Sequence, residues 1–462
     1  MRGVLRVLPT LAVAAAALLG CTDQTAPGSP APLVRTVTVD TSDVGAILLN
    51  VTLDGPGVVQ VEYWRDPQRK LRLLVRETTT TASIFLPRLD AGQTYQYIVS
   101  GLRADGGESR ALGGSLVAPS LPDDLAQLSF AVSGGSTQPI TMLEVVSTFH
   151  GFVAVDRGGQ IVWWWRTVGI PQGMTRRENG NFVLNDAGYR LVEVSPAGDI
   201  IHELITNVSQ ALSSHHDVIA TPANTLLFLA GDKRTVGDST LVGDAIWEWT
   251  PETNRLVKRW TTFDFYDPSR DVGTRSTAMD WVHANSLALG DHGNVILSMN
   301  WLDQIISIAP DWESIEWKLG GRGSTVAVDA GAAFQGQHTA SVLPNGHVLL
   351  FDNGRDRAAP QAYSRGLELV MDASARVARR VWEFRTTPDS YAPYVGSSRR
   401  LINGNTMVFF GLATAFVGAT GPLAGYEVRP DGAVVWRLLV NGASVVYRGT
   451  PLSSIGGETD VP

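Results

Sequence analysis

Short apolar segments separated by turn residues run along the chain from residue 34 to its end. Within each segment apolar side chains alternate with polar ones, and Gly, Pro, Asn or Asp follows closely. Alternation with a period of two is typical of half-buried β-strands, whereas a helix needs apolar residues three and four apart. After the N-terminal region, no stretch keeps the helical period over about 12 residues. The pattern therefore predicts an all-β protein.

The segment 34–118 holds the first group of predicted strands. They are 34–40, 46–53, 58–64, 71–77, 82–89 and 94–102. Short strands with turns between them favour a β-sandwich. The stretch "LDAGQTYQYIVSGL" also resembles the E–F corner of fibronectin type III modules, with Tyr95 as the corner residue. We expect a fibronectin type III-like or immunoglobulin-like sandwich that acts as a spacer or supports the main domain.

From about residue 128 the pattern becomes a repeat, which we expect to form one domain over 128–462. Each unit has a strand, a turn with Asn or Gly, a second strand, and a later strand marked by Trp or Glu. All-β repeats of about 45 to 70 residues suggest β-propeller blades. Residues 151–166 and 443–452 look like parts of one blade that closes the ring. We expect six blades, with seven as the alternative. The five visible turns lie in 177–184, 221–229, 290–298, 343–351 and 402–410.

The composition fits an exported β protein better than a nucleic-acid-binding one. Apolar residues make up 44% of the chain, enough for a large core, and charged residues only 18%. The formal net charge is −8 and there is no basic block. We therefore expect no nucleic-acid partner.

The N-terminus resembles a bacterial lipoprotein signal. Arg2 and Arg6 precede an apolar run that ends in "LLGC", where Cys21 is the only cysteine. We expect 1–21 to be a signal peptide and 22–33 a tether, with Cys21 lipidated as the mature N-terminus. The protein would then be exported and anchored on the periplasmic or cell-surface side of a membrane. With Cys21 acylated, no thiol would remain for a disulfide or for cysteine catalysis.

Three of the 8 histidines stand near the start of corresponding blade strands. His216 lies six residues before Pro222, and His338 lies six residues before Pro344. His283 begins the matching strand of the blade between them, with a slightly longer run before its turn. Because innermost strands surround the propeller axis, we expect the three imidazoles to converge at one mouth of the channel.

The adjacent His215 and His216 should not share a direction, because side chains alternate along a strand. The register with His338 selects His216, and we expect His215 to point away or to cap the preceding loop. Three converging imidazoles suit either a zinc site or a nucleophile with a general acid. Carboxylates available to orient them are Asp217, Asp280 and Asp352.

Longer motifs surround these histidines over about residues 130–450. They include "HHDVI", "DWVHANSL", "QHTASVLPNGHVLLFDNG", "YSRGLEL" and "RRLINGNTMV". In this order they resemble the bacterial arylsulfotransferase family. The resemblance implies a six-bladed propeller with an N-terminal β domain, exported to the periplasm. It also implies transfer of a sulfuryl group from an aryl sulfate to a phenol, without a nucleotide sulfate donor and without a cofactor or metal.

The resemblance assigns a role to each histidine of the trio. His338, in the "QH" motif, would attack sulfur and become transiently sulfated. His283, of the "DWVHAN" motif, and His216, of "HHD", would protonate the leaving phenolate and bind the sulfuryl oxygens. Neutral imidazole is a competent nucleophile near pH 7, and an imidazolium is a suitable acid.

One position departs from the family pattern. The strand after the "DWVHAN" motif usually carries an arginine, and this chain has Asn300 there. Losing a charged contact to the sulfuryl oxygens would cost about 2–4 kcal/mol. Arg322 or Arg355 could replace the missing charge. For substrate binding the sequence points to Asn300, Arg355 and Trp281, the last either stacking on a phenolic ring or packing in the core.

Two alternatives to an active transferase remain open at this point. One is a catalytically weak or inactive propeller that binds phenolic or sulfated ligands. The other is a three-histidine metal site on His216, His283 and His338.

Overall fold

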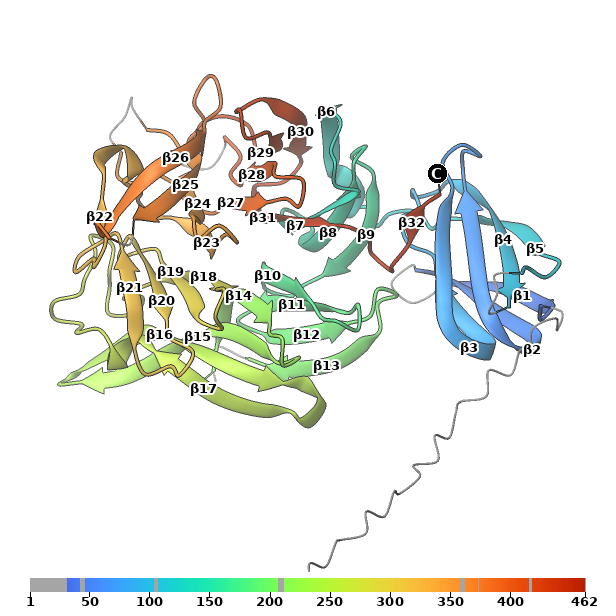
Figure 1. Ribbon diagram of the computed structural model, residues 1–462, viewed down its shortest axis with the longest axis horizontal. Coiled ribbons are helices and arrows are strands. Elements are labelled where there is room, and N and C mark those ends of the chain that lie inside the picture. Colours follow the sequence, from blue (N-terminus) through green and yellow to red (C-terminus); the bar gives the residue numbers. More distant parts are fainter. Residues whose placement is uncertain are drawn as a thin grey trace, which may run out of the picture.

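The computed structural model is all-β in the residues that it describes, as the alternation predicts (Figure 1). The only helices in these residues are short 3-10 turns at Leu125–Gln127, Pro251–Thr253, Thr262–Asp264 and Ala330–Ala332. None of them has the length or apolarity to cross a membrane. Cys21 lies outside the described residues, as do the predicted signal peptide and most of the tether. The described ranges are 31–41, 46–103, 107–206, 212–357, 362–372, 374–414 and 418–461.

The N-terminal part of the chain forms a six-stranded sheet in the order β32-β3-β2-β4-β5, with β1 paired to β2. Two predicted strands, 46–53 and 58–64, are one strand in the structure. The chain bends at bulges around Gly57 instead of turning, so β2 pairs first with β1 and then with β4. The strands are β1 (Val34–Thr41), β2 (Ile47–Trp64), β3 (Leu71–Phe85), β4 (Thr94–Leu102), β5 (Leu112–Val117) and β32 (Thr459–Asp460).

This sheet encloses a hydrophobic core of its own. Buried Val59, Val61 and Val99 belong to it. The hydroxyl of Tyr95 accepts the backbone N–H of Asp90 at 3.0 Å, which is the contact expected of the corner tyrosine.

Six further sheets of four or five strands occur within the described residues. In Figure 1 they surround a common centre. The first three are β10 (Ile170–Arg176), β11 (Phe182–Ala187), β12 (Arg190–Val194) and β13 (Ile200–Ile205); β14 (Ser214–Ala220), β15 (Leu226–Val236), β16 (Ser239–Thr250) and β17 (Arg255–Thr261); and β18 (Ala284–Leu289), β19 (Val295–Met299), β20 (Gln304–Ile308) and β21 (Ile315–Leu319).

The other three sheets complete the circle. They are β22 (Ala327–Val328), β23 (His338–Val342), β24 (Val348–Asp352), β25 (Arg365–Asp372) and β26 (Val377–Phe384); β27 (Ser397–Arg400), β28 (Thr406–Phe410), β29 (Ala424–Val428), β30 (Val434–Asn441) and β6 (Ser129–Gly134); and β31 (Val445–Leu452), β7 (Ile140–Val146), β8 (His150–Asp156) and β9 (Ile161–Arg166). The innermost strands β10, β14, β18, β23, β27 and β31 each contact the next, and β31 contacts β10.

The predicted turns join the first and second strands of five sheets. Each turn has one residue in the left-handed region, which a tight reversal between antiparallel strands requires. These residues are Gly180 (φ 87°), Asn224 (φ 60°), Gly293 (φ 82°), Gly346 (φ 78°) and Gly404 (φ 87°).

The two ends of the repeat region close the circle. Strand β31 pairs with β7, so residues 443–452 and 151–166 do contribute to one sheet, as predicted. A second closure was not expected: β6, near the start of the region, pairs with β30 and forms the outer edge of the neighbouring sheet. Two of the six sheets therefore contain strands from both ends of the repeat region.

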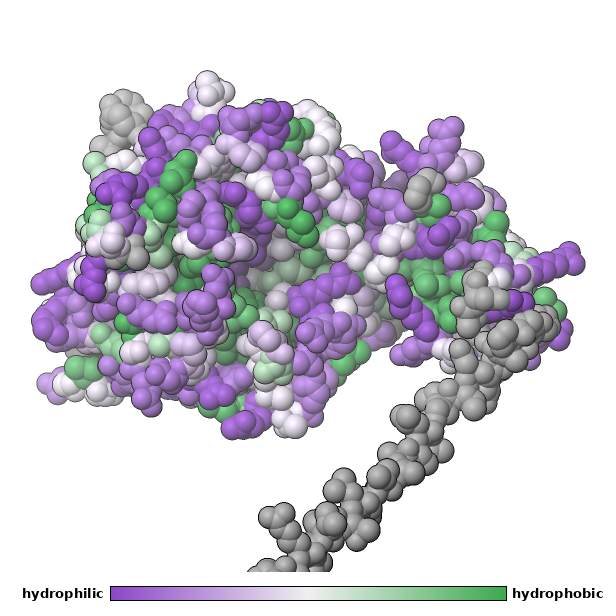
Figure 2. Space-filling view, in the orientation of Figure 1, coloured by the Kyte–Doolittle hydropathy of each residue, from purple (hydrophilic) through white to green (hydrophobic). Residues whose placement is uncertain are grey.

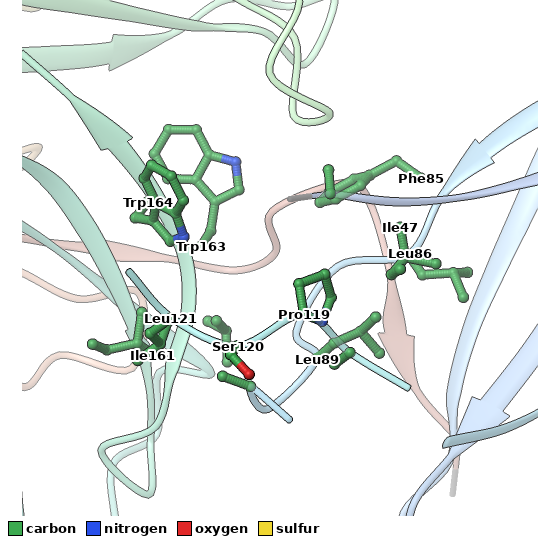
Figure 3. A pocket seen from close by; sticks show the side chains of 14 residues that line it. Ile47, Phe85, Leu86, Leu89, Pro119, Ser120, Leu121, Ile161, Trp163 and Trp164 are labelled. Atoms are coloured by element: carbon green, nitrogen blue, oxygen red, sulfur yellow. The ribbon is translucent and has the colours of Figure 1, made fainter. Parts of the chain in front are cut away.

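The chain's last strand leaves this circle and joins the N-terminal sheet. Although the predicted propeller segment 128–462 includes it, β32 pairs with β3. The carboxylate of Asp460 bridges Arg88, at 3.0 Å, and Arg157, at 3.2 Å, from the two parts of the molecule. At this junction a small pocket of about 80 Å³ lies between Phe85 on one side and Trp164 on the other (Figure 3).

The outer surface is mostly polar on the face seen in Figure 2, with small apolar patches between hydrophilic residues. The part built from the six sheets is hollowed near its centre in this view. The side chains at the start of the innermost strands are therefore those to inspect for a functional site.

Candidate active site

The three predicted histidines stand where innermost strands begin, beside irregular backbone. His216 lies in a bulge of β14 and has φ 55°. His283 directly precedes β18 with φ 52°, and Thr339, next to His338, has φ 50° in a bulge of β23. Non-glycine residues in this region are under strain of about 1–3 kcal/mol, and such strain is concentrated at functional sites.

Ring contacts join the histidines into one cluster. The imidazole centroids of His216 and His283 are 4.6 Å apart. The ring of Tyr447 lies 5.9 Å from that of His216 and 6.1 Å from that of His338, in edge contact with both. The structure thus brings the three predicted histidines together and adds a tyrosine from the ring-closing strand β31.

His216 enters this cluster by a different route from the predicted one. In the strand ladder His338 pairs with Phe351, the fourth residue of β24. The fourth residue of β15, Leu229, pairs with His215 and not with His216. The reason is the size of the two bulges. In β14 the unpaired residues His216 and Asp217 have no residue opposite them, whereas in β23 the two unpaired residues stand opposite one residue of β24. The bulge and the positive φ, not a shared strand register, turn His216 toward the other histidines.

The tautomer of His338 follows from its hydrogen bond to Asn353. His338 Nδ1 lies 2.7 Å from Asn353 Oδ1, and Nδ2 of Asn353 donates to the carbonyls of Ala392 and Val395, both at 2.7 Å. Both amide hydrogens are therefore used, and Oδ1 can only accept. Nδ1 of His338 must carry the proton, which leaves the lone pair on Nε2.

Burial keeps His338 in the neutral form. The residue is 3% exposed, and burial lowers the pKa of His338 to about 3. Near pH 7 the cluster therefore holds an uncharged imidazole with a free electron pair, which is what a nucleophile requires.

The free energy of unfolding should depend on pH more steeply in the wild type than in a His338→Asn variant. The folded pKa of about 3 lies below the ordinary value of 6.5, so between these values the unfolded chain binds a proton that the folded chain does not. Stability contributed by neutral His338 is therefore lost as pH falls through this window, with a slope of up to about 1.4 kcal/mol per pH unit. Urea unfolding at several pH values measures the difference. Parallel pH dependence in the two proteins would contradict it.

His283 is held by a carboxylate and a tryptophan. Its Nδ1 lies 2.7 Å from Asp280 Oδ2, and Trp301 Nε1 donates to the same oxygen at 2.8 Å. The Trp301 ring stacks on the imidazole with centroids 4.2 Å apart. Asp280 thus orients His283, as the sequence predicts, and leaves its Nε2 for the cluster.

His215 does not point away from its neighbour. Its Nδ1 lies 2.9 Å from Nδ1 of His216, and its Nε2 lies 3.1 Å from Oδ1 of Asp244 on β16. His216 itself is surrounded by protein atoms, although part of its surface stays accessible. Burial, and then the neighbouring His283, hold the pKa of His216 well below its usual range.

A buried ion pair lies directly beside the cluster. Arg448 donates to Oδ1 of Asp217 at 2.7 Å and to the carbonyl of Asn285 at 2.6 Å. The two charged side chains are 1% and 5% exposed. Asp217 also accepts the N–H of Leu287 at 2.8 Å, so it ties β14 to β18. Asp217, predicted to orient a histidine, instead neutralises this arginine.

Asn300 is not placed to offer a donor to a substrate. Its amide nitrogen donates to the carbonyls of Gly336 at 2.8 Å and Gln337 at 3.3 Å, and its oxygen accepts from Arg355. Asn300 therefore supports the segment that leads into His338. The guanidinium of Arg355 lies 4.9 Å from the centroid of the Trp301 ring, which in turn stacks on His283.

Of the two arginines considered as replacements for the missing charge, Arg355 is the one near the cluster. Its side chain is fully buried and pairs with Asp303 at 3.4 Å. Burial raises the pKa of Asp303 to about 6. Arg322 donates to the carbonyl of Arg270 at 2.9 Å and is exposed.

Two other predicted residues lie elsewhere. Trp281 is 2% exposed and packs in a core cluster, with its Nε1 donating to the carbonyl of Asp271 at 2.8 Å. The aromatic ring beside His283 is that of Trp301. Asp352, the third expected orienter, pairs with Arg357 at 2.5 Å and Arg365 at 2.8 Å.

The described residues contain no group of three or more His, Cys, Asp or Glu side chains that could hold a metal ion. In the cluster each Nδ1 already has a protein partner. The remaining Nε2 atoms of the three histidines are the nitrogens that can take part in proton transfer or nucleophilic attack.

Several contributing residues were not found from the sequence. Asn353 directly follows a buried strand, but the Asp-Asn-Gly stretch around it is typical of a turn and gives no sign of a contact with His338. Tyr447 stands in the split sheet, and aligning β31 with the other innermost strands would have placed it beside the histidines. His215 and Asp244 gave no usable signal, because their contact depends on the bulge of β14.

Several solved structures are distantly similar to the chain. A protein of unknown function from Bacteroides caccae has 12% identity and a TM-score of 0.46, covering 68% of this chain and 99% of that one. Virginiamycin B lyase from Staphylococcus aureus has 11% identity and a TM-score of 0.36, covering 76% and 93%. The periplasmic gluconolactonase of Pseudomonas aeruginosa has 12% identity and a TM-score of 0.35, and the match covers 88% of this chain and 99% of that one. Neither fold details nor activity follow from such values.

Among curated proteins none matches the chain significantly. The family model of Arylsulfotransferase (ASST), in contrast, matches residues 131–448. This match covers about two thirds of the chain and includes all three clustered histidines. The protein therefore belongs to the arylsulfotransferase family.

Proposed function

We propose that the protein transfers a sulfuryl group from an aryl sulfate to a phenolic acceptor through a sulfohistidine at His338. The family acts on small aryl sulfates and phenols. The observation that carries the proposal is the hydrogen bond from His338 to Asn353, because it leaves the lone pair of a neutral imidazole on Nε2. Transfer from 4-nitrophenyl sulfate to phenol by the purified protein is the direct test.

In the first half-reaction, Nε2 of His338 attacks the sulfur of the donor. The N–S bond forms, and the bond from sulfur to the aryl oxygen breaks with its electron pair on oxygen. The aryl oxygen takes a proton from the imidazolium that the second half-reaction of the preceding turnover leaves on His283 or His216. The hydrogen bond from Nδ1 to Asn353 stabilises the positive charge that develops on the sulfated ring.

In the second half-reaction, the phenolic acceptor gives its proton to that imidazole. Its oxygen attacks sulfur, the S–N bond breaks, and the electron pair returns to Nε2 of His338. The two half-reactions balance in atoms and charge without a further reactant. Both pass through a transition state with negative charge on the peripheral sulfuryl oxygens, so a positive group nearby should accelerate both.

We assign this positive charge to Arg355, which would act at a distance from beside Trp301, because its fully buried side chain does not reach a substrate. An Arg355→Met variant keeps an apolar stem against Trp301 but removes the guanidinium, and we expect kcat/KM for sulfuryl transfer to fall about 100-fold or more. Arg355→Lys, which keeps a charge, should retain more activity than Arg355→Met. Steady-state kinetics with 4-nitrophenyl sulfate and phenol measure both. Equal activity in wild type and Arg355→Met would show that the charge comes from elsewhere.

One observation favours a second candidate, a propeller that binds phenolic or sulfated ligands with little turnover. Asn300 stands where the family usually has an arginine, and its amide nitrogen is bound to backbone carbonyls. This alternative predicts that an aryl sulfate raises the melting temperature without formation of product. Product formation by the wild type would remove it.

The architecture and location belong to the same proposal. The six sheets support a six-bladed rather than a seven-bladed propeller over residues 128–452, preceded by a fibronectin type III-like domain over 34–118. The bond between Tyr95 and Asp90 supports that second assignment. Lipidation of Cys21 would anchor the exported protein at a membrane surface, with 22–33 as the tether.

A further inference from the structure

A chain of close polar contacts runs from a buried carboxylate to the histidine cluster. Asp244 Oδ1 lies 3.1 Å from Nε2 of His215, and Nδ1 of His215 lies 2.9 Å from Nδ1 of His216. The other oxygen of Asp244, Oδ2, accepts the backbone N–H of Ala284 at 2.6 Å. Asp244 is 6% exposed. The chain therefore links β16, β14 and the start of β18.

The positions of the protons follow from what each atom can do. Nε2 of His215 lies 3.1 Å from a carboxylate oxygen, where a protonated nitrogen is attracted and a lone pair is repelled, so the proton of His215 belongs on Nε2. In neutral His215 the other nitrogen, Nδ1, then carries a lone pair and accepts. Nδ1 of His216 must supply that hydrogen, and the lone pair of neutral His216 is left on its Nε2.

We propose that Asp244 and His215 are positioning residues that hold His216 with its proton on Nδ1, so that Nε2 of His216 accepts the proton of the phenolic acceptor. This inference rests on the proposed function. When Nε2 takes the proton, the imidazolium of His216 donates through Nδ1 to His215, whose Nε2 lies 3.1 Å from the Asp244 carboxylate. The carboxylate thus stabilises, through His215, the charge that forms during the second half-reaction.

The surroundings of His216 explain why such support is needed. Its ring faces His215, His283, the more distant His338, and Tyr447, and the guanidinium of Arg448 lies nearby. Burial and these basic groups oppose a positive charge on His216. Asp217 balances Arg448 by direct pairing, and Asp280 is bound to His283. Asp244 is the carboxylate that connects to His216 through a hydrogen-bonded neighbour.

The ring nitrogens can be observed directly, without turnover. In protein labelled with 15N-histidine, two-bond 1H–15N correlation spectra distinguish protonated from unprotonated ring nitrogens, and His215→Asn and His216→Asn variants assign the signals. We expect His216 to be protonated on Nδ1 and His215 on Nε2 near pH 7. His216 protonated on Nε2 alone would overturn the inference.

Asp244→Asn provides the second arm. The bond to Ala284 N–H keeps the amide oxygen of the new side chain in place, which turns its NH2 group toward His215. His215 must then accept through Nε2 and donate through Nδ1, so both imidazoles switch tautomer and His216 loses its Nε2 lone pair. We expect kcat to fall about 100-fold or more, with a shift in the limb of the pH–rate profile that reports the base. Unchanged His216 signals, or an unchanged profile, would overturn the inference.

His347→Asn is the matched control. His347 also bonds a carboxylate through Nδ1, Glu368 at 2.7 Å, but it lies in a turn at the other end of its strand. Its replacement should leave the His216 signals, kcat and the pH profile unchanged. If the wild type transfers sulfuryl groups but His216 carries its proton on Nε2, this inference alone is overturned. The expected tautomer without any transfer overturns the proposed function, and with it the proton-accepting role.

Discussion

Substituting His338 by asparagine is expected to lower the rate of sulfuryl transfer at least about 1,000-fold. Asparagine is smaller and polar, and its amide can still donate to Asn353, so the buried site keeps a partner for the Asn353 oxygen. What disappears is the lone pair on Nε2, and without it no bond to sulfur can form. Steady-state transfer from 4-nitrophenyl sulfate to phenol measures the loss.

A covalent intermediate provides an independent readout of the same prediction. When the donor is supplied without an acceptor, the wild-type peptide that contains His338 should gain the mass of one sulfuryl group, and the variant should not. His292→Ala is the control, because His292 is exposed in a turn and should transfer at the wild-type rate. Wild-type turnover by His338→Asn, or a sulfuryl group on another histidine, would refute the assignment of the nucleophile.

The second large effect concerns stability rather than chemistry. Asp217→Asn is expected to lower the free energy of unfolding by about 3–5 kcal/mol, because it leaves the buried guanidinium of Arg448 without its carboxylate. Glu144, whose pKa burial raises to about 7, lies near enough to compensate part of the loss by ionising. Urea-induced unfolding at pH 7 measures the change.

An exposed ion pair serves as the comparison for Asp217→Asn. Asp431 pairs with Arg429, and the two side chains are 55% and 52% exposed. Asp431→Asn should change stability far less than Asp217→Asn does, since solvent screens such a pair. Similar effects of Asp217→Asn and Asp431→Asn would mean that the buried pair beside the cluster contributes little to the fold.

Local patterns predicted the strands of the repeat well, and they failed where a bulge replaces a turn. Each of the five turns carries a residue with positive φ at its tip, a local requirement that Gly or Asn announces in the sequence. The stretch around Gly57 shows the same residue types, but the chain continues as β2, because both halves of that strand find partners in the sheet. Turn residues alone do not distinguish a reversal from a bulge.

The histidine trio could be found from the sequence, but its supporting contacts could not. The spacing of His216 and His338 to their turns places both on the first strands of repeat units, which surround one axis. The bulge of β14, which the spacing does not reveal, turns His216 toward the others. Asn353 and Asp244 reach His338 and His215 across strands, and such contacts depend on bulges and on which face of the sheet each residue occupies. The same reason separates Trp301, which stacks on His283, from the buried Trp281.

By itself, therefore, the sequence determined the all-β class, the repeat, the three histidines and the family resemblance, because each of these is a matter of residue type and spacing along one chain. Tertiary structure alone decided which nitrogen of His338 is protonated, that Arg355 and not Arg322 lies near the cluster, and that His215 is hydrogen-bonded to His216. These features depend on distances of a few ångströms between strands of different sheets, which spacing along the chain does not encode.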